Sequence, residues 1–214
     1  MSLSLLVDIF LHLDTHLAAF MNEYGSAVYV FLFLVLFCET GLVVTPFLPG
    51  DSLIFASGAL AATGIMSSWS LPLFMAAAVL GNMLNYQIGR ALSDRVRRRQ
   101  KIRFIRQEYL DRTQDFFDRH GGATIIITRF MPILRTFSPF VAGVGAMKYR
   151  RFFLFNLIGG VSWAAAFFAI GFFFGNVPFV RTHFSVIVIG IVLVSLIPAV
   201  AAFIKAKTAP PARD

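Results

Sequence analysis

The chain has 214 residues, of which 57% are hydrophobic and only 14% are charged. A mean hydropathy of +0.75 excludes an ordinary soluble domain of this size and indicates a membrane protein with several apolar segments. The formal net charge of +8 does not indicate nucleic-acid binding, because no Lys or Arg occurs in residues 1–89 and ten of the 19 fall between Arg90 and Arg119. Basic residues clustered beside apolar segments are typical of cytoplasmic loops.

Residues 1–24 are predicted to form an N-terminal amphipathic helix that lies at the membrane surface. Within 3–20, the polar residues Asp8, His12 and His16 follow one another at intervals of four and share one helical face. A polar stripe among leucines is typical of an interfacial helix. We interpret the two histidines as part of this wet face and expect no metal site there.

Residues 25–205 are predicted to form one membrane domain, followed by a disordered basic tail at 206–214. A bilayer requires an apolar helix of about 20 residues. About four spanning helices fit this requirement, and the chain offers them at 26–44, 70–91, 152–175 and 184–204. Two further apolar segments, 45–66 and 122–147, are interrupted by prolines and charges, so neither is a plain spanning helix.

The first interrupted segment contains the sequence PFLPGDS, which places helix breakers and a carboxylate at membrane depth. Irregular backbone is tolerated there only if it is buried in protein or lines a water-filled cavity. We predict the turn of a re-entrant hairpin, in which Pro46 and Pro49 break the helix and Gly50 permits the turn. Asp51 could serve only to cap a helix that begins at Leu53, and this alternative stays open beside a functional role.

The second interrupted segment, 122–147, is predicted to form another hairpin around Pro132 and Pro139, with Gly143 at a turn or a close helix contact. If the basic run 90–119 is cytoplasmic, the two hairpins enter from opposite faces and 26–44 crosses from inside to outside. Both termini are then cytoplasmic. Paired broken segments of this kind are typical of an inverted repeat with a transport site near the midplane.

Four ionisable residues lie within these apolar stretches: Glu39, Asp51, Arg129 and Arg135. Each would cost about 2.5–3.5 kcal/mol at the bilayer centre if it were unpaired. One hypothesis is that they form salt bridges that lock the two halves together, although buried ion pairs stabilise poorly compared with apolar packing. The other is a polar cavity, in which the arginines bind a phosphate and a carboxylate carries a proton.

Two longer motifs, FCETGLVVTPFLPGDSLIFASGAL and RFMPILRTFSPFVAGVGAMKYRRFFLFNLIGGVSWA, resemble the bacterial DedA family, also called SNARE-associated or VTT-domain proteins. The resemblance covers about residues 25–205. It implies an integral protein of the bacterial inner membrane with two opposed re-entrant hairpins, and it points to the same two acids and two arginines. It also implies lipid movement across the bilayer and dependence on the proton gradient. The family's GDxxxYxxGR motif is here GNMLNYQIGR, so Asn82 replaces an acid.

From these observations the sequence predicts an all-α lipid translocase that moves undecaprenyl phosphate. Three alternatives stay open: a translocase of phosphatidylethanolamine-type phospholipid, a proton-coupled carrier of a small solute or ion, and a non-transporting scaffold for envelope assembly. The expected partners are membrane lipids and protons, with no nucleic acid, and a homo-oligomer is compatible with the sequence. No nucleophile–base motif, metal-ligand spacing or cofactor fingerprint indicates an enzyme.

Overall fold

The computed structural model describes residues 13–42, 50–93 and 107–175, together with 177 and 190. Each secondary-structure element in this part of the chain is helical. Several predicted features lie outside the described residues: the interfacial face around Asp8 and His12, the prolines Pro46 and Pro49, the span 184–204 and the tail 206–214.

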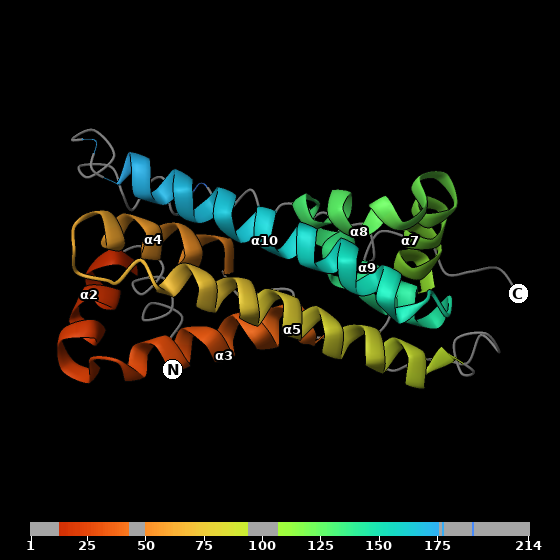
Figure 1. Ribbon diagram of the computed structural model, residues 1–214, viewed down its shortest axis with the longest axis horizontal. Helices are drawn as coiled ribbons and strands as arrows, with labels where there is room; N and C mark the ends of the chain where they lie inside the picture. Colours follow the sequence, from red (N-terminus) through yellow and green to blue (C-terminus); the bar gives the residue numbers. More distant parts are fainter. Residues whose placement is uncertain (1–12, 43–49, 94–106, 176, 178–189, 191–214) are drawn as a thin grey trace, which may run out of the picture.

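The helices follow one another along the chain and assemble into an elongated bundle (Figure 1). Their bounds are α2 Leu13–Tyr24, α3 Ala27–Gly41, α4 Gly50–Ala62, α5 Ser70–Ala91, α7 Gln107–His120, α8 Thr124–Ile127, α9 Pro132–Val144 and α10 Tyr149–Phe174. Two short 3₁₀ turns flank α8, at Gly121–Ala123 and at Thr128–Phe130.

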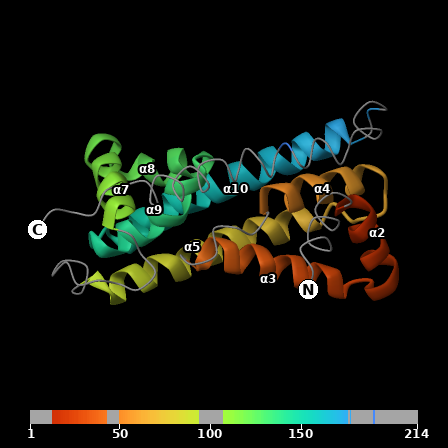
Figure 2. The same cartoon turned by 180° about the vertical axis from the view of Figure 1, so that it is seen from behind.

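The two long helices α5 and α10 run antiparallel, side by side along the long axis of the bundle (Figures 1 and 2). At 1.5 Å per residue they are about 33 and 39 Å long, enough to cross the ~30 Å hydrocarbon core of a bilayer. Within the most apolar stretch of each helix, only 44% of α5 and 33% of α10 is buried inside the protein. The remaining apolar surface faces outward, as expected for helices in contact with lipid. The predicted helix 70–91 has the observed bounds, and α10 lies close to the predicted 152–175.

Helices α3 and α4 form the two arms of one hairpin, and α3 covers residues 27–41 of the predicted span 26–44, whose crossing of the bilayer stays a prediction. At 15 and 13 residues, they are about 22 and 20 Å long, shorter than the hydrocarbon core. The backbone N–H of Ser67, after α4, donates to the hydroxyl of Tyr29, near the start of α3, at 2.9 Å. The end of α3 and the start of α4 also meet, through Glu39 and Asp51. The chain therefore turns back between Gly41 and Gly50.

A second hairpin falls inside the predicted segment 122–147. Its first arm is the irregular run 121–130, and its second arm is α9. Met131 between them is extended, and Pro132 occupies the first turn of α9, where its missing N–H costs nothing. Pro139 lies buried inside the same helix. The two hairpins lie at opposite ends of the bundle in both views (Figures 1 and 2).

Each hairpin packs its second helix on the long helix of the other half: α4 on α10, and α9 on α5. Glycines allow the backbones to approach so closely that a side chain would overlap the facing carbonyl. Gly143 of α9 faces the Tyr86 carbonyl of α5 in this way, as its predicted role in close contact requires. The facing pairs are Gly58 with Phe168, Gly171 with Phe55, Gly89 with Phe140 and Gly143 with Tyr86.

Helix α2 confirms a helix in the N-terminal region, but it packs on the bundle through buried Leu17, beside the end of α4. This end of the bundle is opposite the one where α5 reaches Arg90 and the basic run. The predicted cytoplasmic N-terminus depends on 26–44 as a crossing helix and stays a prediction.

Candidate functional site

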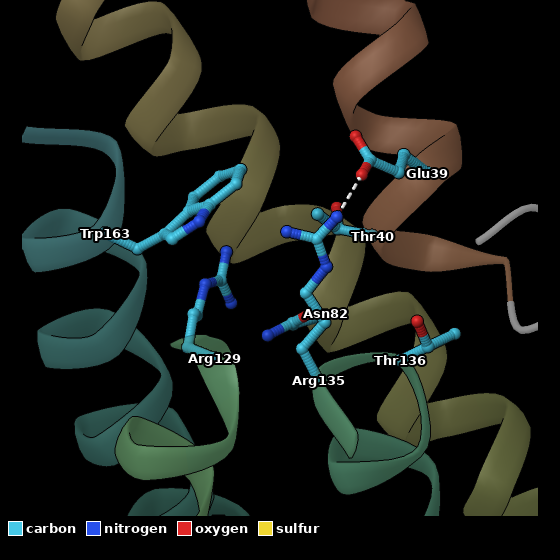
Figure 3. A pocket seen from close by; sticks show the side chains of 7 residues that line it. All are labelled: Glu39, Thr40, Asn82, Arg129, Arg135, Thr136 and Trp163. Atoms are coloured by element: carbon cyan, nitrogen blue, oxygen red, sulfur yellow. Dashed lines mark hydrogen bonds and ion pairs between the residues drawn. The ribbon is translucent and has the colours of Figure 1, made fainter. Parts of the chain in front are cut away.

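The four buried charges of the sequence converge where the tips of the two hairpins meet (Figure 3). Arg135, in the first turn of α9, donates from Nη1 to Asp51 Oδ1 at 2.7 Å and from Nη2 to Glu39 Oε1 at 2.8 Å. Glu39 is 3% exposed and Asp51 6%. One guanidinium thus joins both arms of the first hairpin to the second, and desolvation makes these charge-assisted contacts strong.

Gly50 has a different role from the predicted turn, because it is the first residue of α4. The Glu39 carboxylate fills the space that a side chain at position 50 would occupy. Glycine at this position therefore lets the acid approach the N-terminus of α4, where the helix dipole favours negative charge. The helix begins three residues before the predicted Leu53, so Asp51 lies inside its first turn and binds Arg135.

Arg129 lies in the same cluster but has different contacts. Its side chain is buried, and the residue is 4% exposed. Nη1 donates to Asn156 Oδ1 over a long 3.4 Å, and the guanidinium lies 5.1 Å from the ring centroid of Trp163. Nη2 has no hydrogen-bond partner, and the described residues give Arg129 no ion pair. Arg135 thus forms ion pairs with two carboxylates. Arg129 is a buried cation for which the described residues provide no ion pair.

Asparagine side chains hold the surrounding helices together. Asn82 of α5 donates to Asn156 of α10 at 2.9 Å, which links the two long helices. Asn85 donates to the backbone carbonyls of Thr136 in α9 and Thr40 in α3, at 2.9 and 3.2 Å. These amides supply hydrogen bonds inside an apolar bundle without adding charge. Asn82, which stands where the family motif has an acid, therefore adds no negative charge here, and its amide binds Asn156 instead.

The cluster encloses a small cavity of about 20 Å³, which is room for roughly one water molecule. The residues that line it are Glu39, Thr40, Asn82, Arg129, Arg135, Thr136 and Trp163. A phosphate group is larger than this space. Trp163 was not among the predicted site residues. Its spacing of seven residues from Asn156 on α10 is the signal that places both on one helical face.

Apolar helices with outward-facing hydrophobic surface around a buried charge cluster define an integral membrane protein with an internal polar site. The chain matches the VTT domain model over residues 48–173. It belongs to the DedA family of membrane proteins.

Three relatives illustrate the range of similarity. Protein DedA of Escherichia coli K12 is 47% identical over 207 residues, which cover 95% of this chain and 94% of DedA. An uncharacterized membrane protein of Mycobacterium leprae is 42% identical over 78% of this chain and 76% of its own length. The inner membrane protein YghB of E. coli K12 is 36% identical over 74% of this chain and 73% of its own length. No solved structure matches the chain.

Proposed function

We propose that this protein is a lipid translocase that moves undecaprenyl phosphate across the bacterial inner membrane. The observation that carries the proposal is Arg129, a buried guanidinium without a described anionic partner, in a polar cavity inside an apolar bundle. A buried cation of this kind is costly unless it is compensated. A lipid phosphate supplies the missing charge, while its prenyl chain stays in the hydrocarbon.

The proposed frame is an inverted repeat. The hairpin α3–α4 and the hairpin 121–144 would enter the membrane from opposite faces and meet near the midplane, where such transporters bind their substrates. Their arms of about 20 Å are long enough to reach the middle of the bilayer but too short to cross it. The crossed packing of α4 on α10 and α9 on α5 supports this symmetry.

In the proposed cycle, the cavity must open before a headgroup enters. The contacts of Arg135 with Glu39 and Asp51 hold the hairpin tips together. Protonation of either carboxylate removes one of the two ion pairs and weakens this closure. Entry of an anionic headgroup would then be coupled to the proton gradient, since the acids are charged in the closed state and neutral in the open one.

Transport is tested in proteoliposomes that contain radiolabelled undecaprenyl phosphate, with an impermeant phosphatase added outside. Lipid from the inner leaflet becomes accessible only if the protein moves it. Arg129→Ala should slow this release by at least about tenfold, the loss expected for a hydrogen-bonded contact to a charged group. Its fold should persist, because removing Arg129 leaves no carboxylate without its partner.

Arg90→Ala, which removes an exposed cation at the end of α5, is the matched control and should transport normally. Phosphatidylethanolamine, followed with a labelled analogue, forms the second arm of the same assay. If the protein moves phosphatidylethanolamine and not undecaprenyl phosphate, the phospholipid is the substrate. If wild-type protein moves neither lipid, the translocase proposal is wrong.

Sidedness is tested with single cysteines in a Cys38→Ala background, labelled in intact cells with an impermeant maleimide. We expect labelling from outside at Ser68→Cys, between α4 and α5, and at Asn22→Cys, in α2. Lys148→Cys, which precedes α10 at the other end of the bundle, should react only after the membrane is opened. Labelling of position 22 and position 148 from the same side would contradict the proposed orientation.

A further inference from the structure

Two buried hydrogen-bond donors share the cavity and have no acceptor among the described residues. One is Nη2 of Arg129, and the other is Nε1 of Trp163. Both residues are at least nine-tenths buried, at 4% and 2% exposure, and both line the same cavity. Unsatisfied buried donors are rare and costly in folded proteins, so two of them beside one cavity indicate a missing acceptor.

The two side chains also hold each other in position. The Arg129 guanidinium lies 5.1 Å from the ring centroid of Trp163, within the range of a cation–π contact. Figure 3 shows the indole above Arg129, on the side of the cavity away from Glu39. A long hydrogen bond from Nη1 to Asn156 engages one edge of the guanidinium. The donors are thus arranged by α10 before any ligand enters.

Arg135 cannot play an equal part in the closed state. Its two terminal nitrogens already donate to Asp51 and Glu39. The three residues carry a formal charge of −1 together, since two carboxylates surround one guanidinium, whereas Arg129 carries +1. An anion in the cavity is therefore repelled from the side of Arg135 and attracted to the side of Arg129.

We propose that Arg129 and Trp163 form the subsite for the phosphate, in which one phosphoryl oxygen accepts from Arg129 Nη2 and Trp163 Nε1, while Arg135 fastens the hairpins. This inference rests on the proposed function and deepens it, because it divides two arginines of the same cluster into different roles. The recognised chemistry is an anionic phosphate ester, bound at the edge of the indole where Nε1–H donates, beside the guanidinium that lies over the ring.

The test uses tryptophan fluorescence, because the chain has only two tryptophans. Trp69 is 81% exposed on the surface, so Trp69→Phe leaves Trp163 as the sole fluorophore. Farnesyl phosphate, a short and soluble polyprenyl phosphate, should change the Trp163 emission saturably in detergent. Farnesol, which lacks the phosphate, should not. Inorganic phosphate shows whether the headgroup alone suffices or the prenyl chain is needed for binding.

Substitutions then separate the roles. In the Trp69→Phe background, Arg129→Lys keeps the positive charge but loses the paired donors of the guanidinium. It should raise the Kd for farnesyl phosphate more than Arg135→Lys does. Trp163→Phe in wild-type protein keeps an aromatic face but removes the donor. Calorimetric titration should give a Kd about tenfold or more weaker than that of Trp69→Phe. Thermal melting in detergent confirms that each variant is folded.

The subsite assignment is overturned if Trp163→Phe binds as tightly as Trp69→Phe, or if Arg135→Lys weakens binding more than Arg129→Lys. It is also overturned if farnesol and farnesyl phosphate change the emission equally. These failures leave lipid translocation intact, provided the proteoliposomes still move undecaprenyl phosphate. If no phosphate compound binds and no lipid moves, both the subsite and the proposed function fail.

Discussion

Replacing Arg135 alone is expected to destabilise the protein more than any other single change at the site. Arg135→Gln leaves Glu39 and Asp51 buried without their cation, and breaking a buried pair in this way costs about 3–5 kcal/mol. That is a large part of the ~5–15 kcal/mol by which proteins are stable. We expect aggregation or a sharply lower melting temperature in detergent, together with unfolding at a lower fraction of added SDS.

The same substitution should be rescued when its partners are neutralised. In the triple variant Glu39→Gln, Asp51→Asn, Arg135→Gln, no carboxylate is left without its cation, and amides can still hydrogen-bond across the hairpin tips. Its stability should rise well above that of Arg135→Gln, since replacing a whole buried ion pair is often neutral, although Arg129 stays charged and loses two neighbouring carboxylates. Arg90→Gln, an exposed arginine lost alone, is the control. A stable Arg135→Gln single variant would show that the two ion pairs do not hold the hairpins together.

The position of the four charges could be predicted because their energetic cost is visible in the sequence. Glu39, Asp51, Arg129 and Arg135 stand in apolar runs, and each would be too costly alone, so their convergence follows from the need for compensation. The helix at Ser70–Ala91 was predictable for a related reason, since a continuous apolar run of spanning length has few other structures.

The arrangement of the first hairpin could not be predicted from hydropathy. The PFLPGDS stretch marks a break in the apolar run, but hydropathy does not show that α3, which ends at Gly41, is the arm that pairs with α4. The turn becomes evident only from contacts between distant residues, such as Ser67 with Tyr29. The same limit affected the predicted cytoplasmic N-terminus, which depended on this segment.

The unequal roles of the two arginines are also a property of the fold. Arg129 and Arg135 are six residues apart and look equivalent in the sequence. Both guanidiniums lie near Trp163 of α10, at 5.1 and 5.8 Å from its ring centroid, but only Arg135 also binds Glu39 and Asp51 of the first hairpin. Trp163 belongs to α10 and lies 28 residues after Arg135, in the same long motif but with no spacing that brings it near either arginine. Its place in the cavity depends on how α10 packs.

The triple variant also distinguishes a translocase from a non-transporting scaffold. If the cluster only locks the fold, Glu39→Gln, Asp51→Asn, Arg135→Gln should support the same cellular function as wild type once its stability is restored. If the carboxylates carry protons and their release opens the cavity, the variant should be folded and inactive. We expect loss of undecaprenyl phosphate movement in the phosphatase assay, to the level of protein-free vesicles.

This comparison is cleaner than exchanging the charges of Glu39 and Arg135. The Glu39 carboxylate fills the space beside Gly50 at the N-terminus of α4, where an arginine is too large and meets the positive end of the helix dipole. If the exchanged variant were inactive, steric strain beside Gly50 would explain the loss as well as a role in transport would. The amides of the triple variant fit the space that the wild-type side chains occupy. Transport by the folded triple variant at the wild-type rate would show that the buried charges hold the hairpins without taking part in lipid movement.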